Sequence, residues 1–420
     1  MRILLFEDHL TDQLAPITTS RPAYAITCAS YRLIDWIREL GKPITADVRS
    51  YLKPIQTADF SDLESFDKWK ADDAQPLLAI NARAVPSVKT FEALRKLVDL
   101  NQTGIVRDGQ AIAAVVLMPA EQNDLAPGTD KGFAQKLASL DDQRRFVSVE
   151  DFTIELFQWP HDVIRQHMQL MNASLEYRLA HGEYEQRQDG VFAAHGATIG
   201  DYSVIDTSHG PILLDSNVQV GPFCYLSGPV YAGPGTRVIE HAALKDAVSL
   251  GHTVKIGGEV EASVIEPYTN KQHHGFLGHS YLGSWINLGA GTCNSDLKNT
   301  YGRINIEYNG RKVASEMQFL GCIVGDYAKT AINTGIFTGK VIGVCSMLYG
   351  FVTQNVPSFM NYAQMFGQVA EIPPDVMVAT QARMFARRKV QQRQCDIDLI
   401  RTMYDLTARE REEPDQIEIY

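Results

Sequence analysis

The sequence lacks the features of several protein classes. Its six cysteines are scattered and form no CxxC pair, which argues against a disulfide framework or a cysteine-based zinc site. No uninterrupted apolar run is long enough to cross a membrane, and the first residues lack the basic start and long apolar core of a signal peptide. Basic charge is also scarce, because the net charge is -11. We therefore expect a reduced, cytoplasmic protein that binds neither nucleic acid nor a membrane.

The composition is that of a globular protein with room for two domains. The chain has 420 residues, of which 45% are hydrophobic and 21% charged. In residues 1–159, apolar runs predict buried parallel strands at Ile3–Phe6, Leu77–Ile80 and Ala111–Met118. Amphipathic runs predict helices at Tyr31–Leu40, Val88–Val98 and Lys131–Leu140. This alternation indicates an α/β domain with a mostly parallel sheet.

A linker helix is expected next, within residues 160–189. Pro160 stands at its start and Gly182 at its end, which is the usual placement of these two residues around a helix. Apolar residues recur between them. We expect this helix to join two domains.

After Gly190 the apolar period changes to six residues, which predicts a parallel β-helix over residues 190–356. Four runs of aliphatic or small side chains share this spacing, and glycine often follows them. The runs are Val220, Leu226, Ala232, Val238, Leu244, Leu250 and Ile256; Ile199 and Ile205; Phe276, Leu282 and Leu288; and Val324, Thr330, Ile336, Ile342 and Leu348. Such a period builds a triangular coil whose inward side chains stack into one core.

Two segments depart from this period. Residues 299–317 alternate apolar and polar side chains around the pair Asn309-Gly310, which predicts an inserted β-hairpin. Residues 357–420 form a C-terminal extension, in which we expect an irregular stretch followed by one helix.

The expected C-terminal helix runs from Pro374 to about Arg411 and is rich in basic residues. These are Arg383, Arg387, Arg388, Lys389 and Arg393. A solvated helix face is the simpler interpretation, and binding of a phosphate-bearing cofactor is the alternative.

The segment from Asn270 to Lys298 has the highest density of chemically functional residues. It contains three histidines, His273, His274 and His279, in a stretch without helical periodicity. A neutral imidazole, with an ordinary pKa of about 6.5, can take a proton from an attacking amine. HHxxxxH is not a familiar zinc-ligand spacing, so no metal is expected here. The segment therefore predicts an active site built on the repeat.

The hexad repeats resemble the left-handed β-helix acyltransferases. The stretches KQHHGFLGHSYLGSWINLGAGT and VGDYAKTAINTGIFTGKVIG carry this resemblance. They are most like the bifunctional N-acetylglucosamine-1-phosphate uridylyltransferase/glucosamine-1-phosphate acetyltransferase family. The resemblance implies a left-handed parallel β-helix, an acetyl-CoA-dependent N-acetyltransferase acting on an amino-sugar 1-phosphate, and a homotrimer with active sites between subunits.

The resemblance also implies roles for individual residues. His273, fourteen residues before Asn287, stands where the family has its catalytic base, and His279 is the second candidate for this role. Asn287 matches an asparagine of the acetyl-transfer site. Phe276 stands where the bacterial enzymes have a tyrosine that contacts the sugar phosphate, and Asp296 where the family usually has asparagine, so the orientation of the acceptor is expected to differ.

The cofactor and phosphate contacts follow in the same way. Ala290 matches a position whose backbone contacts acetyl-CoA, and the backbone of Gly289–Gly291, including Gly291, could supply N–H donors to an oxyanion. Lys271 and Lys298 would suit the sugar phosphate as charge partners. Lys329 is expected either to line the cofactor cleft or to face solvent.

The N-terminal half resembles the family's nucleotidyltransferase domain only faintly. Such enzymes carry a glycine-rich loop directly after their first strand, because backbone N–H groups must approach the nucleotide phosphates. Here the first glycine is Gly41, and LAPITTSRP occupies that place. Arg21 could act as a phosphate clamp instead. Asn81 stands where a magnesium-binding aspartate is expected, and Asp151 is a candidate for a later metal ligand, so Mg²⁺ is expected only if this domain is active.

Three functional hypotheses remain open from the sequence. The first is acetyl transfer by the β-helix, fused to a divergent nucleotidyltransferase domain. The second makes sugar-1-phosphate nucleotidyl transfer the main activity. The third is a non-catalytic trimeric β-helix that binds ligands or regulates a partner.

Overall fold

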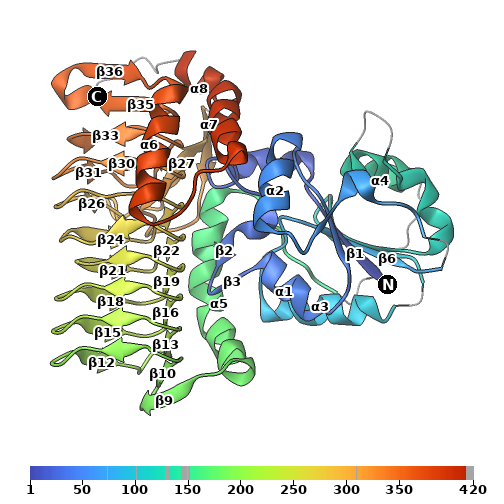
Figure 1. Ribbon diagram of the computed structural model, residues 1–420, viewed down its shortest axis with the longest axis horizontal. Helices are drawn as coiled ribbons and strands as arrows, with labels where there is room; N and C mark the ends of the chain where they lie inside the picture. Colours follow the sequence, from blue (N-terminus) through green and yellow to red (C-terminus); the bar gives the residue numbers. More distant parts are fainter. Residues whose placement is uncertain are drawn as a thin grey trace. The chain divides into compact units, whose positions relative to one another are not determined.

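The structure is a computed structural model (Figure 1) that describes residues 1–72, 74–100, 102–127, 132–142, 149, 152–308 and 310–412. The chain divides into two compact units. Unit 1 comprises Met1–Leu14 and Arg21–Trp159, and unit 2 comprises Ala15–Ser20 and Pro160–Tyr420. The short segment Ala15–Ser20 thus belongs to unit 2, where the Ser20 hydroxyl donates to Asp326 at 2.5 Å. No helix in the described ranges has the length and hydropathy needed to span a membrane.

Unit 1 is an α/β domain built on a six-stranded sheet, in the order β5-β4-β1-β6-β8-β7. Its strands are β1 (Arg2–Phe6), β4 (Ile44–Asp47), β5 (Glu64–Ser65), β6 (Leu77–Asn81), β7 (Gly104–Asp108) and β8 (Ala111–Leu117). A two-stranded ribbon adds β2 (Thr27–Cys28) and β3 (Tyr31–Arg32), and the helices are α1 (Leu33–Glu39), α2 (Lys53–Asp59), α3 (Val88–Val98) and α4 (Phe133–Asp142).

One strand prediction for unit 1 is wrong in direction. The run at Ala111–Met118 forms β8, but it pairs antiparallel with β6 and with β7. The cause is local: Gly109, with a φ of +58°, and Gln110 form a two-residue turn that returns the chain directly from β7. The strands β1, β4, β5 and β6 are parallel as expected. Lys131, the first residue of the expected helix at α4, lies outside the described residues.

The main segment of unit 2 starts with α5 (Pro160–His181), at the place where a helix was predicted, and continues as a stack of short strands (Figure 1). The first sheet contains β9 (Glu185–Gln188), β10 (Val191–Ala193), β13 (Ile212–Leu214), β16 (Val230–Ala232), β19 (Val248–Leu250), β22 (Val264–Ile265), β25 (Tyr281–Leu282), β29 (Cys322–Val324) and β32 (Lys340–Ile342). Apart from the antiparallel edge strand β9, neighbouring strands in it are parallel.

The second and third sheets supply the other two faces of the triangle. The second contains β11 (Thr198–Ile199), β14 (Gln219–Val220), β17 (Arg237–Val238), β20 (Lys255–Ile256) and β23 (Asn270–Lys271), and is continued by β30 (Lys329–Thr330), β33 (Met347–Leu348), β35 (Met360–Ala363) and β36 (Gln368–Glu371). The third contains β12 (Val204–Asp206), β15 (Tyr225–Ser227), β18 (Ala243–Lys245), β21 (Glu259–Glu261) and β24 (Phe276–Gly278), and is continued by β26 (Cys293–Asn294), β31 (Gly335–Ile336) and β34 (Phe351–Val352).

The hexad residues form the core of this coil, with one exception. The longest predicted run is buried throughout. Phe276, however, points outward, and Leu277 takes the inward position. The reason is an irregular spacing: the inward residues Leu277 and Leu282 are only five residues apart, so a period of six counted back from Leu282 arrives at Phe276. The expected combination of an α/β domain and a hexapeptide-repeat β-helix is otherwise confirmed.

The inserted hairpin is confirmed as the antiparallel pair β27 (Asn305–Tyr308) and β28 (Arg311–Ala314), although Asn309 of its turn lies outside the described residues. The single C-terminal helix is wrong, because the chain forms α6 (Pro374–Arg387), α7 (Gln394–Leu406) and α8 (Ala408–Glu412). Lys389, with a φ of +58°, leaves the helical conformation after α6. The stretch expected to be irregular contains the antiparallel pair β35 and β36.

The buried face of α5 makes unit 2 sensitive to acid. His167 is fully buried, and its Nε2 lies 2.7 Å from the Ala247 carbonyl, while burial lowers its pKa to about 4. An unfolded histidine takes up its proton near pH 6.5, so the unfolded chain gains protons first as the pH falls. The free energy of unfolding should therefore fall between about pH 6.5 and 4, by about 3 kcal/mol for this residue.

Urea unfolding at pH 7.5, 6.0 and 4.5 tests this expectation. His167→Gln should show a shallower fall in stability than the wild type over this range. An equal pH dependence in the two proteins would contradict the assignment. Some dependence should persist in the variant, because burial also lowers the pKa of His161 to about 4.

Candidate functional site

The segment singled out in the sequence turns a corner of the β-helix between the second and third sheets. His273 and His274 lie on this corner between β23 and β24, and both are exposed. The Gly291 N–H, on the same corner of the next coil, donates to the His274 carbonyl at 3.0 Å. Among the described residues, no hydrogen bond uses the Ala290 N–H. An exposed imidazole and an open backbone donor thus occupy adjacent turns.

Glycine is required at position 291. Its φ is +74°, and a Cβ there would lie 2.1 Å from the Asn333 side-chain oxygen on the following coil. The Asn333 N–H in turn donates to the Ala290 carbonyl at 2.7 Å. Close stacking of the coils therefore fixes the backbone that presents the Ala290 N–H.

Asn287 and Lys329 lie beside this corner, in one outward row of the second sheet. Asn287 is exposed, and its backbone forms parallel β-bridges with Asn270 on one side and with Lys329 on the other. Lys329 is partly buried, its ammonium donates to the Tyr327 carbonyl at 3.2 Å, and burial lowers its pKa to about 8. The structure therefore brings Asn287, Lys329 and the Ala290 turn together.

Lys271 is not on the surface, in contrast to the sequence-based expectation. It takes an inward position of the coil, in register with Ile256, and is only 2% exposed. Its ammonium donates to the carbonyls of Gly257 at 2.8 Å and His273 at 3.1 Å, and burial lowers its pKa to about 8. Because its donors are directed at main-chain oxygens, Lys271 holds the His273 backbone and does not face a substrate phosphate.

Asp296 lies with His279 and not with His273. The His279 Nδ1 is 2.9 Å from a carboxylate oxygen of Asp296, and its ring stacks on Phe319 with centroids 5.2 Å apart. His273 and His279 stand at opposite ends of β24. Asp296, which stands where the family usually has asparagine, thus pairs with the second of the two candidate bases.

Phe276 lies between these two positions, on the outer face of β24. A Cβ on Gly278 would meet both the Phe276 ring, at 2.4 Å, and the Asp296 carboxylate, at 2.3 Å. The ring and the carboxylate therefore flank the same glycine. Lys298 is farther along the inserted segment, where its ammonium donates to the Arg303 carbonyl at 2.9 Å.

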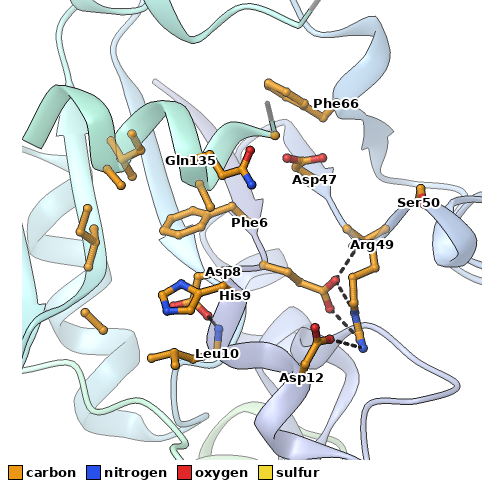
Figure 2. A pocket seen from close by; sticks show the side chains of 18 of the residues that line it. Phe6, Asp8, His9, Leu10, Asp12, Asp47, Arg49, Ser50, Phe66 and Gln135 are labelled. Carbon is orange, nitrogen blue, oxygen red and sulfur yellow. Dashed lines mark hydrogen bonds and ion pairs between the residues drawn. The ribbon is translucent and has the colours of Figure 1, made fainter. Parts of the chain in front are cut away.

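Unit 1 has its own pocket, of about 860 Å³, at the carboxyl ends of β1 and β4 (Figure 2). This edge of a parallel sheet is where α/β proteins usually bind ligands. Glu7 follows β1, and Arg49 follows β4. The Arg49 guanidinium contacts the Glu7 carboxylate at 3.0 and 3.2 Å and lies 3.6 Å from Asp12. Although burial opposes its charge, Glu7 and its neighbours raise the pKa of Arg49.

Arg49, and not Arg21, is the arginine that lines this pocket. The backbone carbonyl of Arg21 accepts a hydrogen bond from the Arg49 guanidinium at 3.0 Å. The sequence analysis overlooked Arg49 as well as Glu7 and Asp47. Glu7 directly follows the predicted strand Ile3–Phe6, and this position was the available signal, because the carboxyl ends of parallel strands meet at one edge. No strand was predicted at Ile44–Asp47, so nothing in the sequence pointed to Asp47 or Arg49.

A buried arginine neutralises the other carboxylate that follows β1. Both oxygens of Asp8 accept from the Arg83 guanidinium, at 2.8 and 2.6 Å, and the Asn81 amide donates to Asp8 at 2.8 Å. Burial alone would raise the pKa of Asp8, but Arg83 and Asn81 outweigh this effect and lower it.

The two carboxylates that follow β1 in this pocket are engaged by arginines, whereas Asp47, which accepts from the Phe133 N–H at 2.9 Å, also lines the pocket. Mg²⁺ is usually held by one or two carboxylates together with water and substrate oxygens. Glu7 and Asp8 are each bound to an arginine, and the described ranges contain no cluster of three metal-ligating side chains. Asp151, the candidate later ligand, lies outside the described residues. We therefore derive no step through a metal.

Residues 3–180 match the sugar nucleotidyl transferase family. A bifunctional sugar-1-phosphate nucleotidylyltransferase/acetyltransferase from Sulfurisphaera tokodaii is 28% identical over 33% of this chain and 35% of its own length. A bifunctional protein GlmU from Cupriavidus pinatubonensis is 32% identical over 36% of this chain and 31% of its own length. The chain thus spans about a third of the length of these curated relatives.

Two solved structures are also similar. An Arabidopsis UDP-N-acetylglucosamine acyltransferase covers 56% of this chain and 83% of its own, with 13% identity and a TM-score of 0.24. AntD from Bacillus cereus, an N-acyltransferase in complex with dTDP and 3-hydroxybutyryl-CoA, covers 47% and 89%, with 15% identity and a TM-score of 0.21. The resemblance drawn from the sequence motifs is confirmed: the chain carries a sugar nucleotidyl transferase match and is similar to the bifunctional nucleotidyltransferase/acetyltransferase proteins.

Proposed function

We propose that the β-helix transfers an acetyl group from acetyl-CoA to the amine of an amino-sugar 1-phosphate. The observation that carries this proposal is the corner on which exposed His273 and the open N–H of Ala290 occupy adjacent turns. The relative from Sulfurisphaera tokodaii is a bifunctional sugar-1-phosphate nucleotidylyltransferase/acetyltransferase, and acetyl transfer is the chemistry that this corner suits.

In this reaction His273 is the general base. An amino sugar is mostly an ammonium ion at neutral pH and cannot attack until it loses a proton. The ammonium ion first releases one proton to water, and the imidazole takes a second proton from the nitrogen as this nitrogen bonds to the acetyl carbonyl carbon. The carbon–sulfur bond then breaks, and the CoA thiolate takes the proton back from His273. Atoms and charge balance without a metal or a redox partner.

The neighbouring residues have supporting roles. The Ala290 N–H is placed to donate to the acetyl carbonyl or its oxyanion, since Gly291 holds this turn in place. Asn287 and Lys329 contact the two substrates from the second sheet. Lys271 is a positioning residue, because it acts through the His273 carbonyl.

A binding experiment tests the acyl donor separately from the chemistry. Acetyl-CoA should raise the melting temperature of the intact protein, because a ligand of the native state stabilises it. Ala290→Trp fills the open side of the turn and should abolish this rise. His274→Ala, a neighbouring substitution, should retain it. An equal rise in wild type and Ala290→Trp would contradict the proposed donor site.

A nucleotidyl transfer in unit 1 is the second candidate function. Its support is the pocket at the carboxyl edge of the sheet, with Arg49 beside it, and the match of residues 3–180. Release of pyrophosphate from a nucleoside triphosphate and a sugar 1-phosphate, lost in Arg49→Ala, would establish it. No release with any of the common triphosphates would exclude it.

The proposed assembly is a homotrimer. Size-exclusion chromatography with light scattering should give about three times the 46.7 kDa chain mass. If the protein is a trimer that neither binds acetyl-CoA nor transfers acetyl groups, a non-catalytic binding or regulatory role replaces the enzymatic one.

A further inference from the structure

Three aromatic side chains, Tyr202, Phe223 and His241, form a column on the corner between the second and third sheets. They come from successive coils, and neighbouring rings lie 5.1 and 5.3 Å apart with interplanar angles of 10° and 11°. Because adjacent strands are about 4.8 Å apart, one ring on each coil is enough to maintain this stack. Tyr202 and Phe223 are 78% and 52% exposed, and His241 is exposed as well. The aromatic column therefore carries its rings on the protein surface.

The backbone of the aromatic column is strained. Tyr202, Phe223 and His241 have φ values of +62°, +59° and +62°, a region that residues with a Cβ rarely adopt. On later coils the same corner has Gly291 and Gly350, with φ values of +74° and +73°, and glycine avoids this strain. The first three coils thus place rings where glycine would suit the backbone better.

A different corner shows what such a stack can receive. Between the first and second sheets, Tyr268 and Trp285 also have positive φ values, and their rings stack at 4.1 Å. There the Phe385 ring of α6 packs on Trp285 with centroids 4.4 Å apart, so a separate element extends the stack. Among the described residues, His241 stacks on no ring other than Phe223. The aromatic column therefore ends on an uncovered ring.

The coil next to His241 has a notch at this corner. Four residues, 239–242, connect β17 to β18, and four, 272–275, connect β23 to β24. Only the pair Gly257-Gly258 connects β20 to β21 between them, so this corner is two residues shorter and carries no side chain. Since the column covers one face of the His241 ring, the other face is directed at the notch.

A purely structural role explains only part of this arrangement. A Cβ on Gly258 would lie 2.8 Å from the Gly275 carbonyl oxygen and 2.9 Å from that of His273, so close stacking of the coils requires glycine there. Contact between the rings also stabilises the first corners. Neither effect explains why the column ends, with an open ring face, beside a notch that is one coil thick.

We propose that a nucleobase binds in this notch, stacked on His241. A flat ring placed there continues the column at the spacing of one coil, and aromatic side chains accept any base because every base has a π-face. Glu240, which is exposed beside His241, offers a carboxylate to a base N–H. The column and the notch carry the proposal, so it depends on neither of the reactions proposed above.

Two compounds could supply the base. The match of residues 3–180 to the sugar nucleotidyl transferase family makes a nucleotide sugar one source. The CoA of the proposed acetyl transfer, which carries adenine, is the other. Both share the chemistry that the notch recognises, so the test uses a pyrimidine and a purine probe.

Isothermal titration of the intact protein with uridine 5′-monophosphate and adenosine 5′-monophosphate tests this site, with ribose 5-phosphate as the probe without a base. At least one nucleotide should bind more tightly than ribose 5-phosphate. His241→Ala should weaken this binding by about tenfold or more, the usual contribution of an aromatic side chain to stacking on one base. His241→Phe keeps a ring face and should restore binding. Tyr202→Ala, the matched control, removes an exposed ring at the far end of the column and should bind as the wild type does.

Photo-crosslinking separates this site from any nucleotide site in unit 1. 5-Iodouridine 5′-monophosphate or 8-azidoadenosine 5′-monophosphate should label a peptide that contains His241 or residues 270–275, identified by mass spectrometry. A uridine label indicates a nucleotide sugar as the ligand, and an adenosine label indicates CoA. Because His241 is exposed, the melting temperature and oligomer mass of His241→Ala should equal those of the wild type.

Three results would overturn the proposal. The first is labelling confined to residues 1–159, and the second is equal binding and labelling in His241→Ala and the wild type. The third is a change in the oligomer mass of His241→Ala without an effect on labelling, which would assign the aromatic column to a contact between copies of the chain.

Discussion

Replacing His273 by alanine should reduce acetyl transfer by about 10²- to 10⁴-fold, the usual contribution of a positioned general base. The effect should fall on kcat, and the far-ultraviolet circular dichroism and oligomer mass should not change, because the side chain is exposed. The measurement is CoA thiol release from acetyl-CoA with a panel of hexosamine 1-phosphates.

Two matched variants make this result specific. His274→Ala removes the adjacent exposed imidazole and should change the rate by less than about threefold, since no role in proton transfer falls to it. His279→Ala removes the imidazole that pairs with Asp296 at 2.9 Å. If this variant loses activity while His273→Ala keeps it, the base is His279, oriented by its carboxylate.

Replacing Arg83 by alanine should destabilise unit 1 by about 3–5 kcal/mol, since it leaves the Asp8 carboxylate without its partner. The Arg83 side chain is fully buried and also donates to the Phe157 carbonyl at 2.5 Å. Asp8 itself is only 14% exposed. Urea unfolding, followed in unit 1 by tryptophan fluorescence, measures the loss.

The pair can be tested further with a double variant. Arg83→Met/Asp8→Asn removes both charges and should cost less than Arg83→Ala, because no unpaired charge remains. The stabilisation of Asp8 should also be lost as the pH falls through its lowered pKa, since a protonated carboxyl no longer pairs with Arg83. A cost below about 1 kcal/mol for Arg83→Ala would mean that Asp8 is free for another role, such as binding a cation.

The repeating part of the fold was accessible from the sequence, because a six-residue period has one structural interpretation. Its failure at Phe276 has a physical cause. The inward residues Leu277 and Leu282 are only five residues apart, so a six-residue period counted from Leu282 selects Phe276 instead of Leu277. A fixed period cannot reveal where a coil shortens.

A shortened coil also explains the position of Lys271. Lys271 was expected to pair with a sugar phosphate, but the coil shortens to fifteen residues between Ile256 and Lys271 and turns Lys271 inward, where two main-chain carbonyls accept hydrogen bonds from its ammonium. The pairing of Asp296 with His279 could not be predicted from the sequence either. It depends on how the coil re-enters its path at Leu320 and Gly321 after the inserted hairpin.

In unit 1, three strands and three helices were predictable from their apolar patterns, whereas the short strands β4 and β5, the strand β7 and the helix α2 were not. The apolar runs of β1 and β6 identified buried strands, whereas the antiparallel return of β8 was set by the turn at Gly109. Arg49 and Glu7 come together from segments forty-two residues apart. These two residues lie close together because β1 and β4, which precede them, are neighbours in the sheet.

The most direct test of the central claim is acetyl transfer by the intact protein. Acetyl-CoA and glucosamine 1-phosphate, or a related hexosamine 1-phosphate, should yield one free CoA thiol for each N-acetylated sugar phosphate, and His273→Ala should remove this activity. Full activity in His273→Ala, or no thiol release with any hexosamine 1-phosphate, would contradict the account.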